Sequence, residues 1–203
     1  MSPRTALGSA LLVATLVPTL AAQSRLATPA LSTKAQAQQT LGETRITVDY
    51  HAPAVRGRTI FGDKVPYDVV WRAGANDTTR IEVSEDVMID GSVLPAGAYG
   101  LHMRPGEEIF EVIFNDVSEA WGSYTYDESR DRLRVSVGAR EDAPFRERLA
   151  YLFEDVDAEG GTLVMHWEDT AVPVRISLPE PAEGEAAARV MQTVGMTEIT
   201  FTA

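Results

Sequence analysis

Cysteine is absent from the chain, so disulfides, thiol catalysis and a lipid anchor on cysteine are all excluded. A domain without disulfides must be stabilised by its own hydrophobic core, and 203 residues are enough to build one. Basic residues are also scarce, with 18 Lys and Arg against 30 Asp and Glu and a net charge of −12. This balance argues against a nucleic-acid or anionic-membrane surface, which would need clustered basic side chains. An acidic surface is most often a solubility feature, and it identifies no partner.

Sequence signatures of catalysis are also missing. The chain contains no G-x-S-x-G elbow, no S-x-x-K motif, and no H-x-H or H-E-x-x-H spacing for zinc. A pair of carboxylates for glycoside hydrolysis stays open as an alternative, because such a pair is defined in space and acidic residues are abundant. The sequence therefore carries no enzyme signature, and we expect no metal and no cofactor.

The N-terminus is typical of a secretory signal peptide. Arg4 and the free amine form the charged region, and the apolar run from Ala6 to Leu20 is too short to span a bilayer comfortably. Small residues at Ala21 and Ala22 suit signal peptidase, so residues 1–22 are the expected signal; a buried N-terminal helix is the alternative. No second apolar run of spanning length follows. We expect export to the periplasm or the medium, with no membrane insertion after cleavage.

The rest of the chain predicts one β-rich domain. Residues 23–34 are Ala, Ser, Thr, Pro and Gln with little hydrophobic pattern, which indicates a flexible leader. Over residues 35–178 the apolar pattern has a period of two, with turns about 8–12 residues apart and no helical pattern between them. This favours an all-β fold, an antiparallel β-sandwich of jelly-roll or Ig-like type. The residues expected to face the core include Ile46, Val48, Tyr50, Ile81, Val83, Tyr99, Leu101, Met103, Phe110, Val112, Phe114, Leu133, Val135, Val137, Leu163, Met165, Trp167, Val172, Val174 and Ile176.

Three local signals refine this prediction. The dipeptide Asp90-Gly91 between two short apolar runs predicts a tight hairpin. Pro173 indicates that the last strand lies at a sheet edge, because proline cannot donate to the ladder. The segment from Phe145 to Phe153 is ambiguous and is compatible with a short helical turn before a strand.

Residues 179–203 form an extension of different character. Glu185 to Val194 has helix-compatible spacing and is followed by Gly195, so a short C-terminal helical appendage is expected. Glu198 to Thr202 alternates again and would bury Ile199 and Phe201 if it paired with another strand.

Several strings within the predicted domain resemble a known bacterial family. The chain reads "GRTIFG" from Gly57, with "VWRAGAN" from Val70 and "LPAGAYGL" from Leu94 farther on. This series closely resembles the domain of unknown function 2911 family over residues 35–178. The resemblance implies an exported β-sandwich protein and brings no activity with it. One departure is that Asp77-Thr78-Thr79 stands where the family usually has an acidic residue followed by Ala-Thr.

The densest cluster of binding-type side chains lies between the predicted strands at residues 44–50 and 80–84. Guanidinium groups bind carboxylate or phosphate through two hydrogen bonds, and Trp or Tyr offers a stacking face for a ring or sugar. A small molecule or glycan is the ligand that such a set suits. The alternative, which we favour slightly in so acidic a chain, is that the arginines pair with Asp49, Asp63, Asp68 or Asp77 and anchor long loops. The candidate ligand-binding residues are His51, Arg56, Arg58, Tyr67, Trp71, Arg72 and Asn76.

Two other groups of residues favour structural interpretations. His102 and His166 fall on strand faces opposite the apolar set, so we expect isolated histidines on polar faces rather than a zinc site. Asp155, Asp157 and Glu159 resemble the start of a calcium loop, but the twelfth position is His166 instead of a glutamate. An acidic hairpin turn is the preferred interpretation.

Three functions remain open from the sequence. The first is a non-catalytic exported domain that binds a small molecule or glycan or takes part in envelope interactions, because arginine and aromatic residues lie on loops of a rigid scaffold. The second is an envelope hydrolase acting on carbohydrate or ester substrates, which would need His51, Arg72 and an acid in one pocket. The third is a purely structural module.

Overall fold

The computed structural model describes residues 31–140 and 143–180. The predicted signal, most of the predicted leader and the predicted C-terminal helix at 185–194 lie outside these residues. Within them the only helix is a single 3-10 turn, η1 (Glu128–Arg130), and all other regular structure is β-strand. No helix in this part of the chain is long and apolar enough to cross a membrane.

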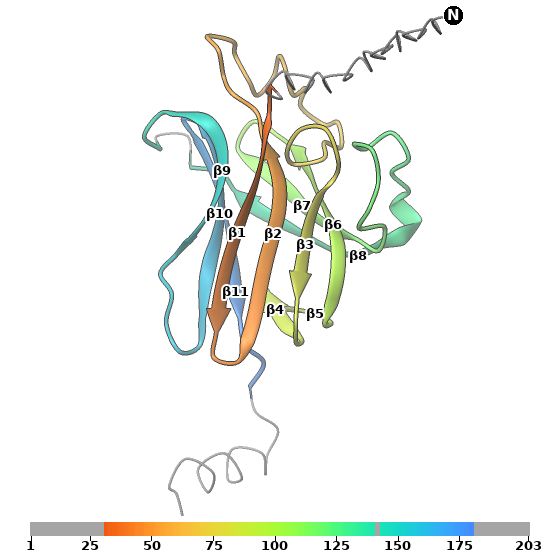
Figure 1. The fold of residues 1–203 in the computed structure, drawn as a ribbon, viewed down its shortest axis with the longest axis vertical. Coiled ribbons are helices and arrows are strands. Elements are labelled where there is room, and N and C mark those ends of the chain that lie inside the picture. Colours follow the sequence, from red (N-terminus) through yellow and green to blue (C-terminus); the bar gives the residue numbers. More distant parts are fainter. Residues whose placement is uncertain (1–30, 141–142, 181–203) are drawn as a thin grey trace, which may run out of the picture.

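Eleven strands form two antiparallel sheets packed face to face (Figure 1), which confirms the predicted β-sandwich. The six-stranded sheet has the order β1-β2-β3-β6-β7-β8, and the five-stranded sheet has the order β5-β4-β11-β10-β9. The bounds are β1 (Thr33–Leu41), β2 (Thr44–Ala52), β3 (Thr79–Val83), β4 (Val87–Ile89), β5 (Ser92–Leu94), β6 (Gly97–Pro105), β7 (Ile109–Asn115), β8 (Asp131–Gly138), β9 (Arg146–Glu154), β10 (Gly160–Glu168) and β11 (Thr170–Ser177).

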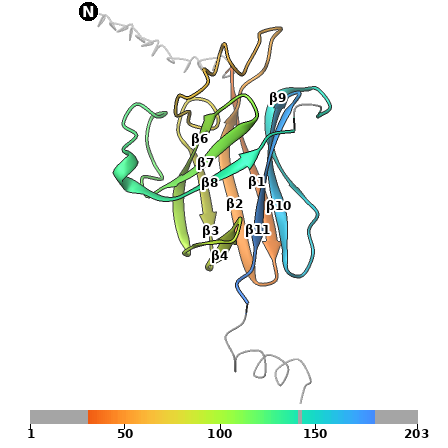
Figure 2. The ribbon, with the colours of Figure 1, turned by 180° about the vertical axis from the view of Figure 1, so that it is seen from behind.

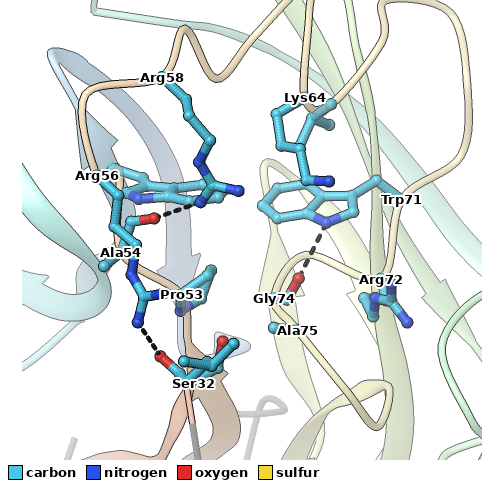
Figure 3. A pocket seen from close by; sticks show the side chains of 13 residues that line it. Ser32, Pro53, Ala54, Arg56, Arg58, Lys64, Trp71, Arg72, Gly74 and Ala75 are labelled. Atoms are coloured by element: carbon cyan, nitrogen blue, oxygen red, sulfur yellow. Dashed lines mark hydrogen bonds between the residues drawn. The ribbon is translucent and has the colours of Figure 1, made fainter.

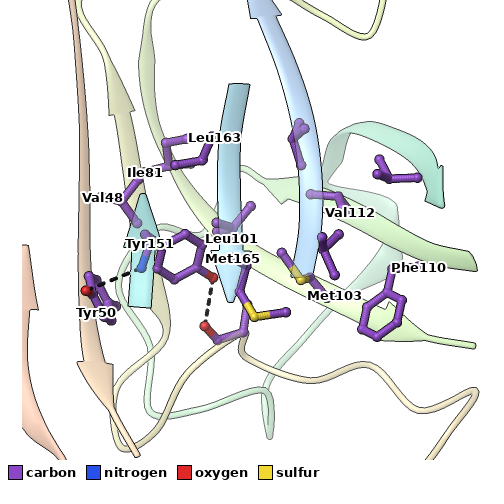
Figure 4. Packing of buried hydrophobic residues seen from close by; sticks show 14 of the residues in the cluster. Val48, Tyr50, Ile81, Leu101, Met103, Phe110, Val112, Tyr151, Leu163 and Met165 are labelled. Atoms are coloured by element: carbon purple, nitrogen blue, oxygen red, sulfur yellow. Dashed lines mark hydrogen bonds between the residues drawn. The ribbon is translucent and has the colours of Figure 1, made fainter. Parts of the chain in front are cut away.

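The alternating residues fill the space between the sheets, as the period of two predicts. On β2, Ile46 and Val48 are fully buried, while Arg45 is exposed. Figure 4 shows how Leu101 and Met103 from one sheet meet Leu163 and Met165 from the other. Each large aliphatic side chain buried in this way stabilises the fold by about 1.5–3 kcal/mol relative to an exposed one.

The Asp90-Gly91 hairpin is confirmed, and its backbone explains the residue types. Both residues have positive φ, 47° and 82°, in the two-residue turn between β4 and β5. A type I′ turn requires this left-handed conformation at both central positions, and glycine and aspartate adopt it more readily than most residues.

Two strand predictions need correction. β11 is an interior strand, so the edge position inferred from Pro173 was wrong. Its pairing with β4 covers only Ile176 and Ser177, however, so Pro173 lies beyond that ladder and pairs only with Val164 of β10.

The ambiguous segment from Phe145 is strand β9 from Arg146 onward, without a helical turn. β1 begins at Thr33, two residues inside the predicted leader.

Tyr151 links the core to the loop before β3. Its ring packs edge-on against Tyr50 with centroids 4.9 Å apart, and its buried hydroxyl donates to the Ala73 carbonyl at 2.8 Å (Figure 4). The Thr79 hydroxyl donates to the same carbonyl at 3.0 Å. Ala73 is fully buried with φ 49°, so these two donors hold a backbone conformation that alanine seldom adopts.

We expect Tyr151→Phe to lower the free energy of unfolding by about 1 kcal/mol. The cost stays at this level because the Ala73 carbonyl keeps Thr79 as a partner and the ring contact with Tyr50 is preserved. Urea unfolding measures the change, with Tyr124→Phe as the control, since the Tyr124 side chain is largely exposed. Equal stability of the two variants would contradict the anchoring role of the Tyr151 hydroxyl.

Candidate functional site

The loop between β2 and β3, residues 53–78, covers one end of the sandwich (Figure 1). Backbone hydrogen bonds fasten it at both ends. Val55 N donates to Glu147 O on β9 at 2.8 Å, and Trp71 exchanges two hydrogen bonds with Met103 on β6 at 2.7 and 2.8 Å. The loop is therefore held against both sheets.

Four non-glycine residues of this loop have positive φ: Arg56, Asp68, Ala73 and Asn76, at 53°, 59°, 49° and 60°. Such conformations are uncommon for residues other than glycine and persist only where the surrounding structure maintains them. They concentrate at ligand sites and other functional loops. The backbone thus indicates independently of the side chains that this loop is more than a connection.

The loop and its neighbours enclose a hollow of about 310 Å³ (Figure 3), which we call the cationic hollow. This volume lies at the lower end of the range for small-molecule sites. The residues that line it are Leu31, Ser32, Pro53, Ala54, Arg56, Arg58, Lys64, Val65, Trp71, Arg72, Gly74, Ala75 and Trp167. Four of them are cationic and none is acidic.

The arginines of the hollow are held by carbonyl groups. Arg58 donates from Nε to Val55 O at 2.9 Å and from Nη2 to Ala54 O at 2.6 Å. Arg72 donates from Nη1 to Asn76 O at 3.0 Å. Arg56 reaches only Leu31 O, at 3.4 Å. These contacts position the guanidinium groups without neutralising their charges.

The predicted ion pairs with Asp49, Asp63, Asp68 and Asp77 are wrong. Asp49 lies 3.7 Å from Arg80 instead. Among residues 31–140 and 143–180, no carboxylate forms an ion pair with Arg56, Arg58, Lys64 or Arg72. The reason is geometric: the loop turns its guanidinium groups toward nearby backbone carbonyls, and residue types alone do not specify that direction.

Two tryptophans form an aromatic surface in the hollow. Trp71 and Trp167 stack with ring centroids 5.9 Å apart and an angle of 20° between their planes. The Trp71 Nε1 donates to Gly74 O at 3.0 Å, while the Trp167 Nε1 is buried and has no hydrogen-bond partner within residues 31–140 and 143–180. Phe61 packs edge-on against both rings. The cationic hollow therefore combines positive charge with a rigid apolar surface.

The structure brings four of the seven predicted ligand-binding residues together in this hollow: Arg56, Arg58, Trp71 and Arg72. The other three lie elsewhere. His51 lines a different hollow beside Asp49 and Arg80, and Tyr67 lines a third beside Glu107 and Glu168. Asn76 contributes its backbone carbonyl to Arg72.

Sequence reasoning missed Lys64 and Trp167. Lys64 could have been found by counting charges over the whole loop, because it stands between the predicted arginines. Trp167 was assigned to the core, and it is indeed only 2% exposed. Its second role, as part of the hollow's wall, has no signal in the strand pattern.

A second hollow of about 300 Å³ adjoins the first, and we call it the aromatic hollow. It shares Lys64, Val65, Trp71 and Arg72 with the cationic hollow. Its other lining residues are Pro66, Val69, Val70, Ser123 and Tyr124. The guanidinium carbon of Arg72 lies 5.9 Å from the centre of the Tyr124 ring. The two hollows thus meet at Trp71 and Arg72.

Ser123 and Tyr124 belong to the segment between β7 and β8, which Figure 2 shows standing off the six-stranded sheet. A network of polar side chains anchors this segment where it joins β7 and β8. Asp131 accepts hydrogen bonds from Asn115 at 2.7 Å, from the Tyr126 hydroxyl at 2.6 Å and from Arg134 at 2.6 Å. Burial and the bond to Asp131 raise the pKa of Tyr126, which stays protonated as a donor.

His102 lies beneath the same segment. It is on the strand face opposite the core, as predicted, and it is only 3% exposed. Its Nδ1 is 2.9 Å from the Ser123 hydroxyl, and its ring is 5.1 Å from that of Tyr126. Burial lowers the pKa of His102 to about 4, although the Asp131 charge opposes the shift. The imidazole is therefore neutral at pH 7.

The remaining polar predictions concern His166 and the acidic turn. His166 is also buried, and its Nδ1 lies 3.3 Å from Arg146 Nε. The acidic segment is confirmed as the β9–β10 hairpin turn, where Asp157 accepts from the backbone N–H groups of Glu159 and Gly160. In the described part of the chain, no three His, Asp or Glu side chains gather as a metal site would require.

Comparison with known proteins supports the family resemblance and adds no activity. A family model described as "Protein of unknown function (DUF2911)" matches residues 32–176, which is most of the chain and nearly all of the sandwich. Searches among curated proteins and among solved structures found no match. The match spans the loop of the cationic hollow as well as the strands that support it. The chain belongs to the DUF2911 family of proteins of unknown function.

Proposed function

We propose that the protein is an exported, non-catalytic binding domain whose cationic hollow holds a small organic anion, a carboxylate or phosphate group carried on a ring or sugar. One observation carries the proposal: four cationic side chains, which have no carboxylate partner among the residues that the structure describes, line the hollow around a stacked tryptophan pair. An unneutralised guanidinium offers two parallel donors to an oxyanion, and the indole surface suits the ring to which that anion is attached.

The charge of the whole chain sharpens this proposal. With a net charge of −12, most of the surface repels anions, so a local group of four cations is a selective feature rather than part of a general basic surface. The volume of about 310 Å³ suits one ring with its acidic group. Export rests on the signal-like residues 1–22, and a mature N-terminus near Gln23 in mass spectra of secreted protein would support it.

We expect the double variant Arg56→Gln/Lys64→Gln to weaken anion binding about tenfold or more, since each lost charged contact is worth roughly 1.5–3 kcal/mol. Both side chains are exposed, and neither makes a strong contact within the protein, so the fold should persist. Binding is measured by thermal shift and calorimetry with galacturonate, benzoate and inorganic phosphate as probes. Galactose serves as the neutral comparison.

Lys34→Gln is the matched control, because it removes the same kind of charge from a different hollow. Equal loss of binding in the Lys34 variant would indicate a general charge effect and contradict the proposed site. No stabilisation by any of the anions in the unmodified protein would also contradict it.

A second candidate function, ester hydrolysis, is favoured by one contact. The Ser123 hydroxyl lies 2.9 Å from His102 Nδ1 at the wall of the aromatic hollow. Binding is the better-supported function, because a histidine with a pKa of about 4 is a weak base for activating a hydroxyl at pH 7. Turnover of a nitrophenyl ester that disappears in Ser123→Ala would favour hydrolysis instead.

A further inference from the structure

The two hollows adjoin each other, and we call the pair the groove. They share the side chains of Lys64, Val65, Trp71 and Arg72, so a ligand in the cationic hollow can continue past Trp71 into the aromatic hollow. A single acidic ring would fill the first hollow and leave the second empty. The shape of the groove therefore suits a ligand longer than one unit.

One exposed aromatic ring, that of Tyr124, lines the aromatic hollow. Tyr124 is 79% exposed and lines the aromatic hollow, and Trp121 on the same segment is 62% exposed. Neither ring contributes to the core. The segment that carries them is nevertheless fixed by Asn115, Tyr126 and Asp131. Tyr124 is thus a flat apolar face presented by an anchored backbone, which lowers the entropic cost of stacking a ligand against it.

Arg72 is fixed at the junction of the two hollows. Its Nη1 donates to Asn76 O, and its guanidinium carbon is 5.9 Å from the Tyr124 ring. Gly122 provides the space for it, because a Cβ at this glycine would collide with Arg72 Nη1, and the glycine has φ 68°. The remaining Arg72 donors can contact groups in either hollow.

From this geometry we propose that the groove binds an acidic oligosaccharide of at least two sugar units. A carboxylate of one unit would lie among Arg56, Lys64 and Arg72, and the apolar face of the next sugar ring would stack on Tyr124. This inference rests on the proposed function and extends it from an organic anion to a uronate-type chain. Sugar rings suit the aromatic hollow because they offer a flat C–H face and spread their polar groups around the rim.

The backbone around the groove disfavours an acidic peptide as the ligand. The residues that line the aromatic hollow come from the loop segments 64–72 and 123–124, which contain no strand of either sheet. The cationic hollow adds Trp167 of β10, which is an interior strand and offers no free edge. An extended peptide is usually bound by pairing its backbone with an exposed sheet edge. The aromatic hollow offers ring surface and side-chain charge instead.

The test compares galacturonic acid with its dimer and trimer by calorimetry on the mature protein. We expect the dimer to bind about tenfold more tightly than the monomer, the gain that roughly 1.4 kcal/mol of stacking supplies. Tyr124→Ala should weaken binding of the dimer more than binding of the monomer and so remove this advantage, and Tyr124→Phe should restore it. Phe145→Ala removes another exposed aromatic ring outside the groove and is the control.

The outcomes separate this inference from the proposed function. If the dimer binds no more tightly than the monomer, or if Tyr124→Ala weakens both equally, the extended site is wrong. The proposal that the cationic hollow binds an organic anion would then still hold. Tighter binding of triglutamate than of the trigalacturonate would likewise overturn the oligosaccharide assignment. If no uronate binds while benzoate or phosphate still stabilises the protein, only the present inference falls.

Discussion

Acidification from pH 7 to pH 4 is expected to lower the free energy of unfolding by about 3 kcal/mol through His102 alone. Burial lowers the pKa of this side chain from 6.5 to about 4, so between these values the unfolded chain carries a proton that the folded chain does not accept. Protonation therefore favours the unfolded state as the pH falls through this range. Above about pH 6.5 neither state is protonated, and the effect vanishes.

Urea unfolding of the protein and of His102→Gln over pH 4 to 7.5 measures this contribution. Glutamine retains a polar group that can reach Ser123, and it does not titrate. We expect the variant to have a shallower loss of stability toward acid, by about 3 kcal/mol across the range. Other groups that titrate in acid, including Asp157 and His166, whose pKa values are also lowered, are present in both proteins and cancel in the comparison. Identical pH dependence would show that His102 accepts its proton in the folded state without penalty.

The sequence predicted the strands best where large apolar residues alternate with polar ones. β2 and β7 are examples, because Ile46, Val48, Phe110 and Phe114 leave no doubt about which face is inward. β1 was missed since its inward positions are filled by small or polar residues such as Ala35 and Ala37. Such residues can fill the inward positions of a strand without giving the alternating apolar pattern by which a strand is predicted.

The sequence predicted which types of residue form the candidate site, but it predicted only some of their positions correctly. Arginine and tryptophan in a long loop correctly indicated residues that share one hollow, because a loop between adjacent strands β2 and β3 must fold over the same end of the sandwich. The partners of the arginines could not be predicted. Whether Arg58 meets a carboxylate or the Ala54 carbonyl depends on backbone turns within the loop, including the left-handed conformation at Arg56. His51 was misplaced for a different reason: it lies on β2, where the alternation of the strand puts it on the same face as Asp49, and both line another hollow.

Trp167→Ala is expected to lower the free energy of unfolding by about 3–5 kcal/mol. The side chain is 2% exposed and packs against Trp71 and Phe61, with ring centroids 5.9 and 6.2 Å away. Removing it opens a cavity at the end of the core and takes away the ring on which Trp71 stacks. The same variant should therefore lose anion-induced stabilisation, because the cationic hollow loses part of its wall.

Trp167→Phe should cost far less, about 1 kcal/mol or below. The Trp167 Nε1 is buried without a hydrogen-bond partner, and a buried unsatisfied donor costs roughly 1–3 kcal/mol. Phenylalanine gives up some buried area but also removes that donor, so the two effects largely offset each other. Urea unfolding compares both variants with Trp121→Phe, a change at an exposed ring that should be neutral. A phenylalanine variant as unstable as the alanine variant would mean that the indole N–H is hydrogen-bonded in solution, and that Trp167 contributes a polar contact as well as an apolar surface to the hollow.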